Sequence, residues 1–182
     1  MACDLSSGRT VSCKDGIGGI IAVFIGNYQD MVNSATFAES SGVVSAIAAQ
    51  TFYQFDVRPE TSSLTINLQS NPTNGTTFFE QNLSLVFQKL DSTDIDDIRI
   101  LCTGRPNIWV QTQDGAIMLL GAEFGMNVTG GSVQSGTAMG DLTGYNIELQ
   151  GKEKAVWYQA TPPTIGDANY PLDNVTNAVV AA

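Results

Sequence analysis

The sequence predicts a mainly β fold: an antiparallel β-sandwich or barrel with one flanking α-helix and a long hairpin. Three observations predict it. Short apolar segments are bounded by turn residues, residues 61–90 alternate as a hairpin does, and a single good helical segment is present. The 182 residues show no linker and no internal repeat, which favours one domain. We expect this domain over residues 16–160, with extended arms at 1–15 and 161–182.

The apolar run from Ile17 to Ile25 predicts the first strand. It is continuous and rich in β-branched residues, so it suits a strand that is buried on both faces. The run is far too short to span a membrane, and no small-residue cleavage site closes it. We therefore expect no membrane span and synthesis inside the cell. Residues 28–41 are polar and predict an irregular excursion.

Two more strands are predicted over residues 42–50 and 52–59. Pro59 ends the second of these, because proline cannot donate a hydrogen bond to a central strand ladder. The second strand is expected to alternate between two faces. Its apolar face contains Tyr53, Phe55 and Val57, and its other face contains Phe52, Gln54 and Asp56.

Residues 61–90 have the clearest β pattern in the chain. Apolar and polar residues alternate with a period of two on both sides of the turn sequence SNPTNGTT. That turn contains a proline and an Asn74–Gly75 pair, which both favour reversal of the chain. We expect an extended hairpin with one apolar face and one face of Thr, Asn, Gln and Ser, which contacts water or a polar partner.

The segment DSTDIDDIRILCTGRP predicts the helix, over residues 92–103. Ser92 or Thr93 can cap it, and the aspartates of its first turn favour the positive end of the helix dipole. Gly104 and Pro106 supply the stop. The alternative is a calcium loop, but the required glycine and terminal glutamate are missing. The helical reading also accounts for the acidic cluster, which comprises Asp91, Asp94, Asp96 and Asp97.

The chain is then expected to return to strands. They are predicted over 107–113, 116–128, 144–151 and 154–160. A loop is predicted over 130–141, and a tight turn at Lys152–Glu153 joins the last two strands into a second hairpin.

Charge and missing residue types exclude several functions. Acidic residues number 18 and basic ones 8, so the formal net charge is −10, and charged residues make up 14% of the chain. The chain contains no histidine, which excludes a Ser-His-Asp triad, a Cys-His pair and an imidazole metal ligand. The low basic content does not suit a duplex-binding module. We expect no enzymatic activity, no cofactor and no metal.

The three cysteines do not form a metal-binding or redox motif. Cys3, Cys13 and Cys102 are odd in number, and their spacing matches neither CxxC nor a zinc knuckle. We expect cysteines that are reduced or serve only to pack the fold. A disulfide between Cys3 and Cys13 is the alternative.

Two other functions can be weighed from the residues. A hydrolase with two carboxylates would draw on glutamates spread over the strands and turns, namely Glu60, Glu80, Glu123, Glu148 and Glu153. Nothing in the sequence brings two of them together. A carbohydrate-binding or capsid-surface β-sandwich would bind its ligand through Trp109 or Trp157.

The order of elements resembles the tail tube proteins of tailed bacteriophages, together with the related tail-completion and secretion-tube proteins. The features that carry the resemblance are the hairpin TSSLTINLQSNPTNGTTFFEQNLSLVFQ, the single helix STDIDDIRILCTG and the closing pair GYNIELQG and KAVWYQA. By order of elements, the resemblance covers roughly residues 16–160. The resemblance implies a virion structural protein whose copies form hexameric rings. It also implies a tail or neck position beside other phage proteins, and a lumen that DNA crosses during ejection without specific binding.

The resemblance gives the hairpin a role in assembly. We expect its polar face and its turn to form the contact between copies or the surface of the lumen. The residues concerned are Thr65, Asn67, Gln69, Asn74, Gly75, Ser84 and Gln88. We expect the two arms to lock adjacent subunits or rings.

Overall fold

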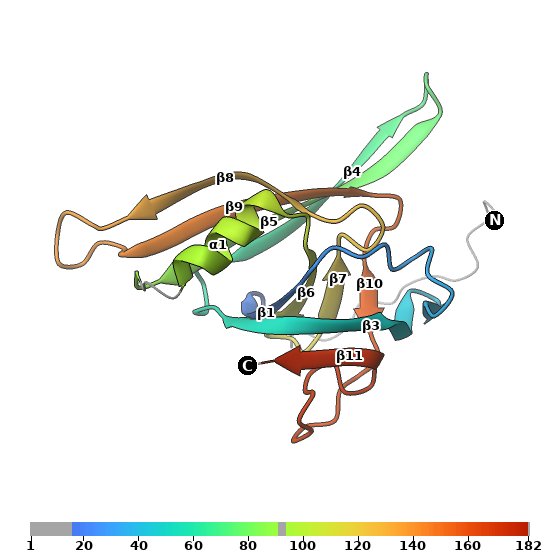
Figure 1. Cartoon of the computed structure of the whole chain (residues 1–182). Helices are drawn as coiled ribbons and strands as arrows, with labels where there is room; N and C mark the ends of the chain where they lie inside the picture. The colour runs from blue at the N-terminus through green and yellow to red at the C-terminus, as the bar shows by residue number, and fades with distance from the viewer. Residues whose placement is uncertain (1–15, 91–93, 182) are drawn as a thin grey trace.

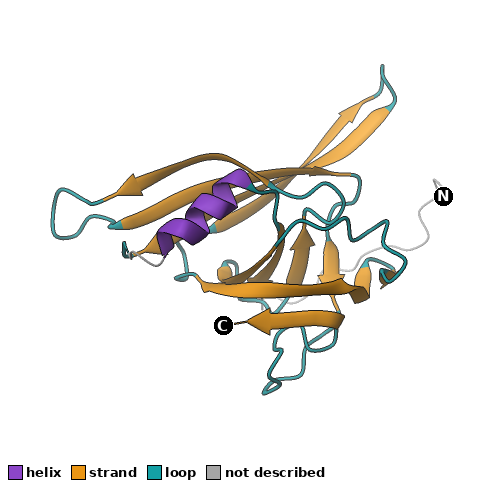
Figure 2. Ribbon diagram, viewed as in Figure 1, coloured by secondary structure: helices purple, strands orange, loops and turns teal. Residues whose placement is uncertain are grey.

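The computed structural model describes residues 16–90 and 94–181, and it is mainly β. A small barrel and a four-stranded sheet form two packed layers, with a single helix among the described residues (Figures 1 and 2). The predicted fold class is therefore confirmed. The helix has ten residues. Among the described residues, no helix is long and apolar enough to cross a membrane.

Five strands close into the barrel because β1 pairs with both β6 and β3. The remaining contacts run from β6 to β7, from β7 to β10 and from β10 to β3. All are antiparallel except the pairing of β10 with β3. The five strands are β1 (Ile20–Gly26), β6 (Asn107–Thr112), β7 (Ile117–Leu120), β10 (Tyr158–Ala160) and β3 (Val43–Asp56).

Strand β3 is long enough that its two halves pair with different strands. Its first residues pair with β10 and with the short β2 (Ala38–Ser40), whereas its later residues pair with β1 and with β11 (Thr176–Ala181). The sequence predicted two separate strands here, and this detail is wrong. One continuous 14-residue strand forms, because Thr51 is itself part of the strand and does not interrupt it.

Side chains from the barrel strands alternate between two cores. Trp109, Phe52 and Phe24 lie in one core, and the rings of Trp109 and Phe52 meet edge to face with centroids 6.4 Å apart. Ile108, Val110 and Val23, which alternate with them along β6 and β1, belong to the second core. The second core lies between the barrel and the four-stranded sheet. Both faces of the barrel wall are therefore buried.

The four-stranded sheet is fully antiparallel and has the order β4-β5-β9-β8. Its inner face contributes Leu83, Leu85 and Leu149 to the second core. The predicted hairpin is confirmed as β4 and β5, whose tip projects beyond the barrel (Figure 1). The strands are β4 (Ser63–Asn71), β5 (Thr76–Gln88), β9 (Gly144–Glu153) and β8 (Asn127–Gln134).

The predicted helix is confirmed as α1 (Asp94–Thr103). Leu101 is buried and Ile98 is half-buried against the second core, whereas Ile95 is exposed. Asp96 and Asp97 lie in the first turn, as the capping interpretation requires. The predicted caps Ser92 and Thr93 lie outside the described residues.

Residues 161–181, which the sequence assigned to a C-terminal arm, lie against the barrel. Leu172 and Val175 are buried in the core that contains Trp109, and β11 then pairs in parallel with β3. Apolar residues spaced through this stretch give it a surface to bury, which accounts for the packing. The N-terminal arm, residues 1–15, lies outside the described residues, as do Cys3 and Cys13.

The second predicted hairpin does not form. Strand β9 continues to Glu153, and the chain then crosses to the barrel, where β10 pairs with β7 and β3. The predicted loop over 130–141 is also shorter than expected, because β8 extends to Gln134. Glycine and serine in that segment lower its β propensity without preventing pairing with β9.

Candidate functional site

The outer face of the four-stranded sheet carries many exposed polar side chains. Thr65, Asn67 and Gln69 alternate along β4 and are all exposed. Their neighbours on β5 in register are Asn82, Glu80 and Phe78. Successive side chains of a strand point to opposite faces, and Leu64 and Ile66 contact the core. The three predicted residues therefore share the face that points away from the barrel.

Two more predicted residues lie on the same face. Ser84 is half-buried and lies opposite Ser63 on one side and Glu148 on the other. Gln88 is exposed at the end of β5. Five of the seven predicted residues are thus brought together on one sheet face.

The last two predicted residues lie at the tip of the hairpin. The side-chain oxygen of Asn71 accepts hydrogen bonds from the backbone amides of Thr73 and Asn74, at 3.0 and 3.3 Å. Gly75 has a φ of +63°, a conformation that a residue with a Cβ rarely adopts. Asn74 and Gly75 are exposed there, away from the barrel.

Few charges interrupt this face. Asn82 accepts a hydrogen bond from the side chain of Gln150 on β9 at 2.9 Å. Glu148 is exposed, and the carboxylate of Glu80 lies 4.0 Å from the ammonium of Lys152. The opposite charges of Glu80 and Lys152 largely cancel, so the surface is chemically a surface of amide and hydroxyl groups. Such a face forms hydrogen bonds without a strong field of either sign.

Both edges of this sheet are open within the described ranges. Strand β4 pairs with β5 alone, and β8 pairs with β9 alone. Because the order is antiparallel throughout, β4 and β8 run in opposite directions. Each presents unpaired backbone donors and acceptors, which is a template for pairing with another chain.

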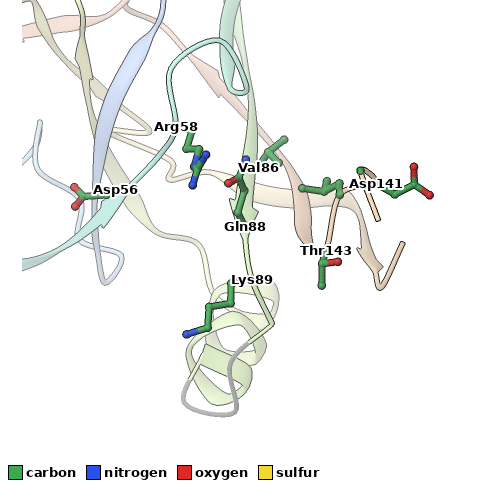
Figure 3. Close-up of a pocket in the computed structure, with 9 residues that line it drawn as sticks. Asp56, Arg58, Val86, Gln88, Lys89, Asp141 and Thr143 are labelled. Carbon is green, nitrogen blue, oxygen red and sulfur yellow. The ribbon is translucent and has the colours of Figure 1, made fainter. Parts of the chain in front are cut away.

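A pocket of about 830 Å³ lies beside the Gln88–Gly144 end of the sheet, the end away from the hairpin tip. Figure 3 shows its lining residues. Two of these residues are joined by a hydrogen bond, because the amide of Lys89 donates to the carbonyl of Thr143 at 2.7 Å. The carboxylate of Asp141 accepts bonds from the amides of Ala138 and Thr137, which lower the pKa of Asp141. The lining residues are Asp56, Arg58, Val86, Gln88, Lys89, Gly140, Asp141, Leu142 and Thr143.

A buried carboxylate, which the sequence could not reveal as such, lies at the other end of β9. Glu153 accepts hydrogen bonds from the amides of Glu123 and Phe124, the shortest at 2.9 Å. Burial raises its pKa, against the opposing effect of these bonds. The structure thus brings Glu123 and Glu153 close, and Glu123 also pairs with Lys154 at 2.5 Å. The sequence signal that could have revealed this burial is the alternation along β9, which puts position 153 on the inner face of the sheet.

The alternative binding residues differ in accessibility. Trp109 is fully buried in the barrel, so it cannot stack on a sugar, and that part of the carbohydrate alternative is wrong. Trp157 is exposed. Cys102 is free and exposed on the helix.

Comparison with known proteins gives little. No family model matches the chain, and no curated protein matches it. One similar solved structure is a chain from a structure titled "Virion of native gene transfer agent (GTA) particle". It is 11% identical, has a TM-score of 0.39, and the match covers 59% of this chain and 89% of that one.

Proposed function

We propose that the chain is a virion structural protein, a repeated subunit of a ring or tube in a bacteriophage tail through which DNA is ejected. The observation that carries the proposal is the pair of open, opposed edges on the four-stranded sheet. The resemblance of the hairpin and helix to the tail tube family supplies the context. The gene transfer agent chain comes from a virion particle as well, but the proposal does not depend on it.

The edges favour a closed head-to-tail ring. Rotation about an axis parallel to the strands brings β8 of one copy beside β4 of the next, and these two strands are antiparallel, as every other pair in the sheet is. Repetition closes a continuous barrel and leaves no free edge. The inner face of each sheet is already covered by its own barrel and helix. The polar outer face therefore lines the lumen.

The lumen surface suits the passage of DNA. It is dominated by uncharged amides and hydroxyls, and its charged residues Glu80, Glu148 and Lys152 leave it slightly acidic. Six copies at −10 each would give a ring about −60 in formal charge. A neutral or acidic wall does not bind phosphates, so DNA slides along it. The hexameric order, and contacts with other tail or neck proteins, belong to the same proposal.

Cross-linking tests the ring directly. A photoreactive amino acid replaces Asn67 on β4 of the full chain, and protein labelled with nitrogen-15 is mixed with unlabelled protein before irradiation. The proposal predicts cross-links to residues 127–134 that join labelled to unlabelled peptides. The same probe at Asp167, which is exposed on the barrel side, serves as the control. A protein that stays monomeric, or one that binds glycans through Trp157 without forming rings, contradicts the proposal.

A further inference from the structure

The loop that joins β4 to β5 consists of residues 72–75, at the hairpin tip that projects beyond the barrel (Figure 1). It contains Asn74 followed by Gly75, and both residues are exposed. No other asparagine in the sequence is followed by glycine. A Cβ added at Gly75 would have no atom within 4 Å, so the space beside this residue is open.

The side chain of Asn74 and the amide of Gly75 are not held by hydrogen bonds. Asn71 accepts bonds from the amides of Thr73 and Asn74, but no described residue accepts a bond from the amide of Gly75. The side chain of Asn74 likewise has no hydrogen-bond partner among the described residues. Glycine also has no Cβ that would shield its amide nitrogen. This nitrogen is therefore free to approach the side-chain carbon Cγ of Asn74.

Other asparagines that precede a small residue are held by the fold. The side chain of Asn33 donates to the carboxylate of Asp30 at 2.9 Å. The amide of the next residue, Ser34, donates to the carbonyl of Met31 at 3.1 Å. Asn177 is held in the same way, because both its side chain and the amide that follows it donate to backbone carbonyls. In these two places the same approach would first require hydrogen bonds to break.

We infer that Asn74 is a site of spontaneous modification, at which the chain converts its own side-chain amide to a carboxylate. Water or hydroxide removes the proton of the Gly75 amide, and the nitrogen forms a bond to Cγ of Asn74. The bond between Cγ and Nδ2 breaks, and Nδ2 leaves as ammonia with one added proton. Water then adds to either carbonyl of the five-membered imide, which leaves aspartate or isoaspartate at position 74.

The modification changes the character of the hairpin tip. Residues 61–79 contain no charged side chain, so the new carboxylate is the first charge in this part of the hairpin. In isoaspartate the main chain also runs through Cβ, which lengthens the loop by one carbon beside Gly75. The inference goes beyond the proposed ring and does not depend on it, because both reacting groups belong to one chain.

Mass spectrometry of proteolytic peptides measures the reaction in the dilute, folded chain during incubation at pH 8 and 37 °C. Loss of ammonia and gain of water shift the peptide mass, and fragmentation identifies the residue. We expect Asn74 to convert at least about tenfold faster than Asn33, because glycine leaves the attacking nitrogen open. We also expect a rate within about tenfold of that in a synthetic peptide of residues 71–77, since an exposed loop tip has little protection.

Two variants assign the reaction to these atoms. Asn74→Gln keeps an amide but would have to form a larger ring, so the mass shift should disappear. Gly75→Ala adds a Cβ beside the nitrogen and should slow the conversion. Circular dichroism confirms that both are folded. A shift that persists in Asn74→Gln, or conversion of Asn74 slower than either bound above, overturns the inference. Whether rings form does not enter this readout, so the proposed function stands or falls separately.

Discussion

The amide of Phe124 donates a hydrogen bond to the buried carboxylate of Glu153, with nitrogen and oxygen 2.9 Å apart. The amide of Glu123 donates to the same carboxylate. These bonds tie the segment before β8 to the end of β9. Burial makes the carboxylate's charge unfavourable even though it is hydrogen-bonded.

Glu153 should make stability depend on pH. Its pKa in the folded protein is raised above the ordinary 4.5, so the ionised form destabilises the fold at neutral pH. This destabilisation is lost as pH falls through the raised folded pKa and is gone below about 4.5. Glu153→Gln should flatten this part of the profile of unfolding free energy against pH. Urea titrations between pH 4 and 8 measure it, and an unchanged profile would show that the group titrates normally.

Removing the acceptor has a separate effect. Glu153→Ala leaves the amides of Glu123 and Phe124 without their partner. Loss of such bonds should lower the free energy of unfolding by about 2 kcal/mol. Chemical denaturation at pH 7 checks this, with Glu60→Ala, an exposed turn glutamate, as the control. Equal stability of both variants would contradict the role of Glu153 in fixing this segment.

Gly144 permits the close approach of β9 to β5. A Cβ at position 144 would lie 2.0 Å from the carbonyl oxygen of Phe87. Gly144→Ala should therefore destabilise the fold by about 3 kcal/mol through overpacking. Gly140→Ala, where no atom lies within 4 Å of the added carbon, should be close to neutral. Thermal unfolding of the two variants separates them, and matched midpoints would refute the predicted clash.

The C-terminal segment should behave as part of the domain. Leu172 is fully buried in the core that contains Trp109, so Leu172→Ala should lower the free energy of unfolding by about 3 kcal/mol. Ile165→Ala changes an exposed side chain in the same segment and should have little effect. Denaturant titrations compare them. If Leu172→Ala were as stable as wild type, the segment would be a dispensable arm.

A basic lumen should hold DNA. Replacing Thr65, Asn67 and Gln69 by lysine places three cations per copy on the proposed wall. Assembled rings of this variant should bind duplex DNA with an affinity that falls by about a thousandfold between about 50 and 200 mM salt. Replacement by serine should give no such binding. Fluorescence anisotropy distinguishes the two, and binding by neither would place these residues outside the DNA path.

The sequence predicted local patterns well and long-range partners poorly. Alternation in β4 and β5, with Asn74–Gly75 at the turn, specifies a hairpin from neighbouring residues alone. The faces of β3 and of the residue after it were assigned correctly for Phe55 and Val57, which contact the second core, but not for Phe52, which is buried, or Tyr53, which is exposed. That strand borders two cores, so its apolar residues occur on both faces and alternation does not identify the buried one.

The candidate site, too, was predictable from the sequence only where neighbouring residues determine it. Thr65, Asn67 and Gln69 share a face because of their spacing, which is visible in the sequence. The site around Glu153 is not visible in the sequence, because the amides of Glu123 and Phe124 reach this carboxylate only through the fold. The crossing from β9 to β10 likewise depends on the pairing of β10 with β7 and β3.

Electron microscopy of the purified 182-residue chain over a range of concentrations shows whether it forms rings. We expect closed rings or tubes with an open lumen, in which the β4 and β8 edges of neighbouring copies meet. Particles that remain single copies at every concentration, or that associate without a lumen, would contradict the proposed ring.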